Sequence, residues 1–439
     1  MLKRAKTGKI ERLRDAVRDA LPAELRAMIR EIEREAANPQ AALRFSIRMA
    51  ALCVIATLLL SHALWFQTDR LYLPAPVFDV LGDLPPWLNP LLYVAMLLLS
   101  AVLLFLPQMR WIGFVLPPVF LLLAAQDQLR GQFSLYMCMF NLLVAACLPL
   151  KITDRHLDPL RYMVCGVYFW AGIYKINRYF IYALFPWFVA TWFPFHAAAQ
   201  AFGFVAPLLE AGVGICLFLP RLRWIGQVVA CCMLAVVFLS IGPVGHNQAM
   251  GVWPVNVYLD GMAVFLFMHD RPLWDIKELK KPLAALGAFL FLLLPALGGL
   301  ELLGHHPSFK LYCCAQFGEV QFAKKEDLSF LPDAVRRRVT PDRRLSGSAI
   351  TMGLFEVGAS PLIPGDAAFL TSIRGFCPYL KAPGQTVARV GDLTHFWSDE
   401  LEERDYAFCD PKGPRLVCTS KNILQPDTGG VLVGPCKAP

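Results

Sequence analysis

Three ionisable residues within the apolar part of the chain, Lys175, Glu210 and Asp260, are the first candidates for chemistry. A charged side chain in a membrane span is costly, so each of them indicates a function by default. A lysine removed from water can lose its proton and serve as a base, but Lys175 could instead extend its ammonium to the membrane surface. Glu210 could pair with Lys175 or only join two helices, and Asp260 could be an interfacial cap near the inner end of a span.

Other polar residues are expected where spans end at the outer surface. His246 and Asn247 could bind a polar head group or shuttle protons, although a satisfied loop histidine is an equal alternative. Asp127 and Arg130 follow another apolar run and could line the same opening. We therefore keep these four residues as candidates for binding a substrate or cofactor.

The elements that must position these residues are membrane helices. Of the 439 residues, 56% are apolar and 17% charged, against roughly 45–50% and about 25% in ordinary globular chains. Apolar runs long enough to cross a bilayer as helices lie near 49–66, 90–106, 111–125, 133–150, 161–176, 201–219, 224–242, 250–268 and 283–303. The sequence predicts an all-α polytopic membrane domain of about nine transmembrane helices over residues 49–303.

Basic residues set the predicted orientation. Residues 1–48 form a basic amphipathic segment, expected as a cytoplasmic helix that lies on the membrane or is solvated. The rest of the net charge of +8 falls mainly in alternate short loops, which places the N-terminus inside by the positive-inside rule. No basic face with interleaved aromatic residues supports nucleic-acid binding. An odd number of spans then puts residues 304–439 outside, as expected of a bacterial inner-membrane protein with a periplasmic or extracellular domain.

An internal repeat divides the predicted spans. Residues 104–113 (LFLPQMRWIG) recur as residues 217–226 (LFLPRLRWIG), with eight identities in ten at a period of 113. Both copies form an inner turn after an outward-to-inward span, so the repeat is parallel. We expect two parallel four-helix units plus one exit helix, although convergence on one turn sequence remains an alternative. The period aligns Lys175 with His62 and Glu210 with the uncharged Leu97.

The C-terminal domain is expected to be small, α/β or β-rich and held by disulfides, with short strand-like runs at 318–322, 349–357 and 385–390. Its even number of cysteines suits an exported domain. The disulfide candidates are Cys313, Cys314, Cys377, Cys409, Cys418 and Cys436. The adjacent pair could instead be redox-active, but separate structural partners are favoured. No metal is expected, because no CxxC spacing occurs.

Two segments resemble a known family. Residues 168–175 (YFWAGIYK) resemble the YFxAGxxK segment of the vitamin K-dependent γ-carboxylases and of the related bacterial HTTM (horizontally transferred transmembrane domain) group. Residues 208–210 (LLE), with 223–226 (RWIG) further on, resemble their LLD…RxIG segment. The resemblance covers about residues 45–300. The chain has Phe133–Tyr136 (FSLY) where the carboxylases have HSYLY, and Tyr174-Lys175 where they have two lysines.

The resemblance implies a quinol or vitamin K-like quinone as cofactor, with Lys175 as the base that activates it and Glu210 as its acidic neighbour. Tyr168, Trp170 and Tyr174 of the same segment are candidates for binding the cofactor. The leading hypothesis is an enzyme that uses a quinol, held between spans 5 and 8, to modify or oxidise a polypeptide at the outer face. The alternative is a non-catalytic scaffold or maturation factor whose outer domain binds a partner protein. A transporter is less favoured, because the repeat is not inverted.

Overall fold

A computed structural model describes residues 19–66, 74–78, 87–246, 252–268, 271–299, 316–331, 333–337, 339–346, 366–381, 383–393, 400–424 and 431–432, with isolated positions at 12, 16, 81 and 85. Several predictions fall outside these residues. They concern Asn247, Cys313, Cys314, Cys436 and the run 349–357.

Among the described residues, four helices are long and apolar enough to cross a membrane: α3 (Pro39–Leu60), α5 (Leu88–Phe105), α10 (His196–Phe218) and α11 (Arg223–Ile241) with the preceding turn η5 (Pro220–Leu222). Shorter apolar helices are α6 (Ile112–Gln126), α7 (Phe133–Cys147), α12 (Val252–Leu266) and the run of α14 (Pro282–Ala288) with η6 (Phe289–Leu293). The four long helices indicate an integral membrane protein in contact with a bilayer. The nine predicted crossings are not confirmed.

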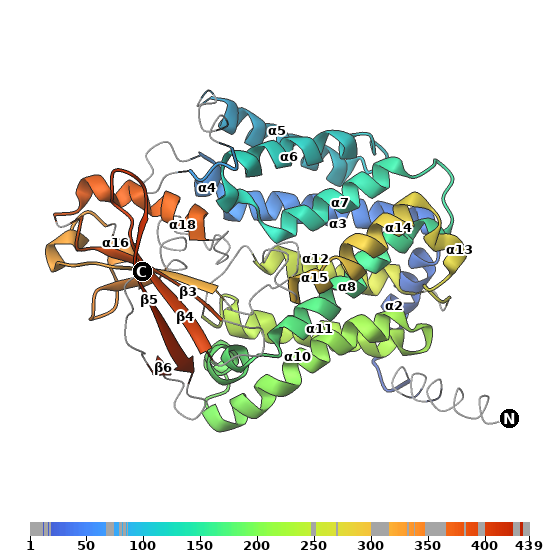
Figure 1. Cartoon of the computed structure of the whole chain (residues 1–439). Helices are drawn as coiled ribbons and strands as arrows, with labels where there is room; N and C mark the ends of the chain where they lie inside the picture. Colours follow the sequence, from blue (N-terminus) through green and yellow to red (C-terminus); the bar gives the residue numbers. More distant parts are fainter. Residues whose placement is uncertain are drawn as a thin grey trace.

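The helices form two groups with the same pattern of neighbours (Figure 1). In the first group α3 packs against α5 and α7, while α6 packs against α5 and α7. In the second group α8 (Asp158–Lys175) packs against α10 and α12, while α11 packs against α10 and α12. The two groups therefore have the same order of helix contacts along the chain. Contacts of α3 with α12 join the groups, and α14 and η6 pack against α8.

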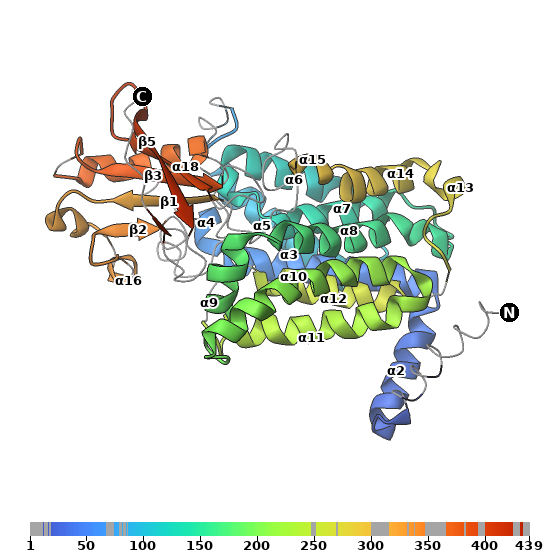
Figure 2. The same cartoon turned by 60° about the horizontal axis from the view of Figure 1, so that its bottom comes forward.

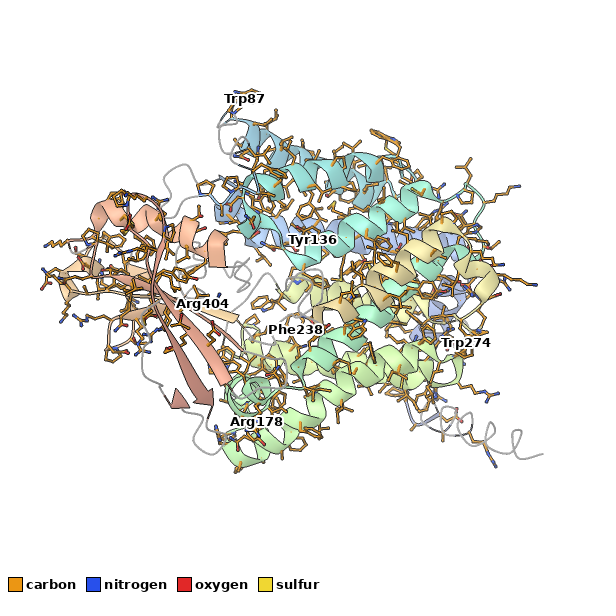
Figure 3. All side chains as sticks on the ribbon, in the orientation of Figure 1. Trp87, Tyr136, Arg178, Phe238, Trp274 and Arg404 are labelled. Carbon is orange, nitrogen blue, oxygen red and sulfur yellow. A yellow bond between two sulfur atoms is a disulfide. The ribbon has the colours of Figure 1, made fainter. Side chains whose placement is uncertain are left out.

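The two ends of the bundle differ in what is attached to them. The amphipathic helix α2 (Ala23–Ala36) extends from one end, and the C-terminal sheet lies at the other (Figure 2). Trp87 and Trp274, which are 63% and 52% exposed, lie toward opposite ends of the bundle (Figure 3). Exposed tryptophans at both ends match the aromatic residues that membrane proteins place at the two interfaces.

The segment between α8 and α10 contains a short helical stretch that the apolar runs did not indicate. It consists of the π-helical turn η4 (Phe180–Leu184) and α9 (Phe185–Val189). Phe180, Phe185 and Val189 pack with Ala199 of α10 in a small apolar cluster of their own. The chain therefore turns from α8 to α10 through a packed aromatic segment.

The described residues of the C-terminal part form a six-stranded antiparallel sheet in the order β2-β1-β3-β4-β5-β6. Its strands are β1 (Gln316–Gln321), β2 (Arg344–Ser346), β3 (Val387–Leu393), β4 (Glu400–Ala407), β5 (Arg415–Leu424) and β6 (Val431–Leu432). Val320 and Val390 pack with Phe369 and Phe376 from α18 (Asp366–Ile373) and η8 (Arg374–Tyr379). The predicted strand-like runs 318–322 and 385–390 coincide with β1 and β3.

A charged row crosses the middle of this sheet. Glu319, Arg389 and Asp405 are aligned on β1, β3 and β4. Arg389 donates two hydrogen bonds to Asp405, at 2.7 and 3.0 Å, and lies 3.6 Å from Glu319 Oε1. Opposite charges on neighbouring strands stabilise one register, so this row helps to fix the pairing of β1, β3 and β4.

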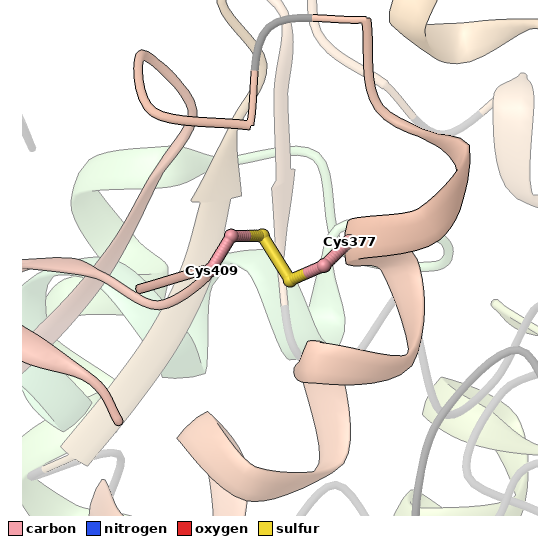
Figure 4. The surroundings of a disulfide bond; sticks show 2 residues. All are labelled: Cys377 and Cys409. Atoms are coloured by element: carbon pink, nitrogen blue, oxygen red, sulfur yellow. A yellow bond between two sulfur atoms is a disulfide. The ribbon is translucent and has the colours of Figure 1, made fainter. Parts of the chain in front are cut away.

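Cys377 of η8 is joined by a disulfide to Cys409 in the turn after β4 (Figure 4). The bond links the helical layer to the sheet across a sequence separation of 32 residues. Cys418 is also disulfide-bonded. Among the cysteines that the structure describes, those in the helical bundle are free.

Candidate functional site

Lys175, the last residue of α8, and Glu210, in α10, form an ion pair. Lys175 Nζ donates to Glu210 Oε1 at 2.7 Å and to Oε2 at 2.6 Å. The two side chains are 13% and 15% exposed, so the pair is largely removed from water. The expected pairing is confirmed, and the catalytic role of the two residues stays a prediction.

Two glycines allow α8 and α10 to approach closely enough for this pair. A Cβ on Gly172 would lie 2.3 Å from the backbone nitrogen of Ala211, and a Cβ on Gly214 would lie 2.5 Å from the oxygen of Cys165. Both distances are far below van der Waals contact. Because Gly172 is three residues before Lys175 and Ala211 follows Glu210, this contact holds the two charged residues in register.

Trp170 and Tyr174 join α8 to the last helical run of the bundle. The indole N–H of Trp170 donates to the oxygen of Leu292 at 3.1 Å, and the Tyr174 hydroxyl donates to the oxygen of Pro295. The two rings stack with centroids 5.7 Å apart. Their polar atoms are thus engaged with the backbone, so the predicted contact with a cofactor would use their ring faces.

Tyr168 and Asp260 form a second buried polar pair in the same unit. The Tyr168 hydroxyl donates to Asp260 Oδ1 at 2.7 Å, and the two residues are 7% and 6% exposed. Asp260 lies in the middle of α12 rather than at its end. Its interpretation as an interfacial cap is therefore wrong: the carboxylate joins α12 to α8.

A cluster of charges that was not predicted from the sequence lies where α8 begins. Arg161, 1% exposed, pairs with Asp158 at 3.0 Å and with Asp154, and Arg271 pairs with both carboxylates. Arg161 Nε also donates to the oxygen of Leu266 at 2.7 Å. The cluster fastens the start of α8 to the end of α12 and the segment that follows it.

The two arginines of this cluster favour the ionised form of Asp154. Burial opposes the charged form, but the hydrogen bonds and charges of Arg161 and Arg271 outweigh it and hold the pKa of Asp154 below its ordinary value. The sequence contained a signal for the cluster, since Asp154, Asp158 and Arg161 recur at helical spacing. Their partner Arg271, however, is far away in the chain.

Asp127 and Arg130 lie in the first unit and are both buried, at 0% and 2% exposure. Arg130 donates to Asn89 Oδ1 at 2.8 Å and lies over the ring of Trp65 at 5.6 Å. Asp127 accepts from the backbone nitrogen of Leu129 at 3.2 Å and lies 3.9 Å from Arg130 Nε. These contacts hold the first unit together, and none of those described joins the two residues to Lys175.

His246 stacks on Trp187, with ring centroids 4.3 Å apart, and its Nε2 lies 2.7 Å from the oxygen of Trp187. This is the satisfied loop histidine that the sequence left as an alternative. It anchors the end of α11 to α9. Asn247 lies outside the described residues, so its role in binding stays a prediction.

The described residues contain no group of three or more His, Cys, Asp or Glu side chains that could hold a metal ion. No family model, no curated protein and no solved structure matches the chain. The buried pair of Lys175 and Glu210 is thus the principal basis on which a function can be argued.

Proposed function

We propose that this chain is a membrane enzyme of the HTTM and γ-carboxylase-like group, in which Lys175 and Glu210 act on a quinol. The observation that carries the proposal is the largely buried ion pair, at 2.6 and 2.7 Å, within the two segments that resemble the family. The second unit carries these charges where the first has His62 and Leu97, so the repeated architecture does not by itself require them.

The pair can act as a base through an internal proton transfer. When a proton passes from Lys175 to Glu210, a neutral amine and a neutral carboxylic acid result, which a site of low polarity tolerates. The amine could then take the hydroxyl proton of a bound quinol, which would leave Lys175 as an ammonium and Glu210 as a carboxylic acid. The net result is one proton moved from the quinol to Glu210, with no change of oxidation state.

A quinol bound at this pair would supply the reductant for a reaction with molecular oxygen that modifies or oxidises a polypeptide at the outer face. The proposed topology has nine crossings, namely α3, α5, α6, α7, α8, α10, α11, α12 and the run from α14 to α15 (Ala296–Gly299). The N-terminus would be cytoplasmic and the sheet domain outside, in a bacterial inner membrane. The attachment of α2 and the sheet to opposite ends of the bundle and the Cys377–Cys409 disulfide support this arrangement.

The test is quinol consumption by the full chain in lipid nanodiscs. A short-chain naphthoquinol would be supplied with oxygen, and its oxidation followed by absorbance. Lys175→Ala and Glu210→Gln should each lower the rate by about 100-fold or more, as expected when an acid–base group is lost. His62→Ala, at the equivalent place in the first unit and exposed, should keep the rate. Full activity of Lys175→Ala in a correctly inserted protein would refute the lysine base.

A non-catalytic scaffold is the second candidate. It is favoured by the observation that Trp170, Tyr174 and Lys175 all use polar atoms to hold α8 to its neighbours. If the scaffold is correct, the wild-type protein should not consume naphthoquinol at all. A Lys175→Met/Glu210→Met double variant should then keep both the fold and any partner that purifies with the outer domain.

A further inference from the structure

Arg223, the first residue of α11, holds together the ends of two other helices of the second unit. Its Nε donates to the oxygen of Leu217, near the end of α10, at 3.0 Å, and its Nη2 donates to the oxygen of Arg271, after α12, at 2.8 Å. The guanidinium lies over the ring of Phe267 at 5.6 Å, and the residue is 2% exposed. Because a planar guanidinium holds both acceptors in a fixed geometry, Arg223 sets where α10 ends relative to the segment that follows α12.

The side chain of Arg271 bonds the same segment to α8. It pairs with Asp158, the first residue of α8, and with Asp154, which lies one turn earlier in the chain. Each step in this series is a hydrogen bond or an ion pair: from α10 to Arg223, from Arg223 to the backbone of Arg271, and from the Arg271 side chain to α8. The end of α10 is therefore tied to the start of α8.

The ion pair of Lys175 and Glu210 ties the same two helices at a second level, nearer the other end of the bundle. Between the two ties, the contacts of Gly172 and Gly214 set how closely the helices approach, but they add no bond that stops one helix from sliding along the other. A slide by one residue is about 1.5 Å, which is large against hydrogen bonds of 2.6 and 2.7 Å. The tie through Arg223 opposes such a slide.

The first unit has a similar closure without an ion pair. Arg110, which the repeat aligns with Arg223, donates from Nη1 to the oxygen of Pro149, after α7, at 3.2 Å. Both arginines thus bond the turn between the second and third helices of a unit to the segment after its fourth helix. Leu97, which the repeat aligns with Glu210, cannot form an ion pair. Arg110 is therefore a matched control for Arg223.

We propose that Arg223 is a positioning residue for the ion pair: it fixes the axial position of α10 against α8, and with it the distance between Lys175 and Glu210. Glu210 and Leu217 are seven residues apart in α10, about 10 Å of helix, so Arg223 acts through the helices rather than by contact with the pair. The inference rests on the proposed function for what the pair does, whereas the position of α10 can be measured without a quinol.

Solid-state NMR of the full chain in lipid bilayers measures the ion pair directly. Isotope labels on the lysine ammonium nitrogen and the glutamate carboxyl carbon report a dipolar coupling that falls with the cube of their distance. Glu210→Gln identifies the coupling that belongs to Lys175. In Arg223→Met this coupling should fall to half or less of its wild-type value, whereas in Arg110→Met it should not change. An equal loss in Arg110→Met would overturn the proposal, because any loosened unit would then disturb the pair.

Two further variants test the route to α8. Arg271→Gln removes the ion pairs with α8 but keeps the backbone oxygen that Arg223 binds, so it should lower the coupling as Arg223→Met does. Arg223→Lys keeps the charge but not the planar fork and should lower the coupling by a smaller amount. The local pair of Lys281 and Glu278, at 2.7 Å, is the internal reference and should stay constant.

The proposal is overturned by an unchanged coupling between Lys175 and Glu210 in Arg271→Gln, even where Arg223→Met lowers it, since the route to α8 would then play no part. If Arg223→Met does not insert into the membrane, Arg223→Lys and Arg271→Gln decide by the same criterion.

Steady-state kinetics connect the position of α10 to the proposed reaction. Because Arg223 does not touch the quinol, Arg223→Lys should lower kcat for naphthoquinol by about tenfold, as expected from a small misplacement of reacting groups, and should leave KM unchanged. A purely structural role would reduce the yield of folded protein without lowering kcat, so an unchanged kcat would contradict the proposal. Failure of the wild-type protein to consume naphthoquinol would refute the proposed function alone, because the NMR measurement uses no quinol.

Discussion

Gly172 of α8 lies directly against the backbone of Ala211 in α10, so closely that a Cβ on Gly172 would come within 2.3 Å of the Ala211 nitrogen. The two helices therefore meet backbone to backbone at the level of the ion pair. Small residues at such positions let membrane helices approach closely. Lys175 can reach Glu210 because Gly172 has no side chain that would hold the two helices apart.

The first prediction is that Gly172→Ala separates α8 from α10. The added methyl meets backbone atoms, which cannot move aside, so we expect a loss of about 1–3 kcal/mol in stability and a weaker Lys175–Glu210 pair. Thermal unfolding in detergent would measure the loss. Gly212→Ala in α10 is the matched control, because a Cβ there meets nothing within 4 Å. Equal stability of the two variants would contradict this prediction.

The second prediction concerns the ion pair as a structural element. Lys175→Met and Glu210→Met should each cost about 3 kcal/mol, because each leaves an uncompensated buried charge, whereas the double variant should recover most of the loss. Thermal unfolding of the four proteins forms a double-mutant cycle. If the stability losses of the two single variants simply added in the double variant, the two side chains would not interact, which would contradict the ion pair.

The third prediction is a pH dependence that arises from Asp154. Because the folded state lowers the pKa of this carboxyl, its contribution to stability is complete above the ordinary value of 3.8 and is lost as the pH falls through the lower folded-state value. Asp154→Asn should therefore be less stable at neutral pH, by about 2 kcal/mol, and should lose less stability on acidification. Melting temperatures between pH 7 and pH 3 would show both effects.

A control for this pH effect is Asp333→Asn. The Asp333 side chain is 76% exposed, so its removal should leave the acid-induced loss of stability as large as in the wild-type protein. If Asp154→Asn lost as much stability on acidification as the wild-type protein, other carboxylates would account for the acid sensitivity.

The fourth prediction concerns the C-terminal sheet domain. Cys377→Ser/Cys409→Ser opens a loop of 32 residues and should destabilise the domain by about 4 kcal/mol in the chain-entropy description of disulfides. Limited proteolysis of the full chain should then cleave η8 and β4 more rapidly. Counting thiols before and after reduction tests the underlying bond: if Cys377 and Cys409 were labelled without reduction, the disulfide would be absent from the purified protein.

The sequence predicted the helices of the bundle well, because the length of an apolar run is a local property. The predicted ends of the helices were less reliable. The helix α3 begins at Pro39, after the N-cap Asn38, well before the apolar run near residue 49. Arg44 and Arg48 concealed this start, since the helix continues through charged residues beyond its apolar part. The pairing of Lys175 with Glu210 could also be predicted, because the sequence places the two residues at a similar depth in their spans.

Contacts between distant segments could not be obtained in the same way. The partner of Asp260 is Tyr168, and its identification requires knowing that α12 lies beside α8. The partners of Trp170 and Tyr174 are backbone oxygens, to which side-chain patterns give no signal. Asp127 and Arg130 were expected to line the same opening as His246 and Asn247, whereas their described contacts lie within the first unit.

The bonds from Trp170 and Tyr174 to Leu292 and Pro295 have a mechanical consequence. Those two oxygens belong to the last helical run before the C-terminal domain, and the two aromatic residues belong to the last turns of the helix that ends in Lys175. A displacement of this helical run would therefore be transmitted through two hydrogen bonds to the end of α8. The ion pair and the last helical run are therefore mechanically coupled.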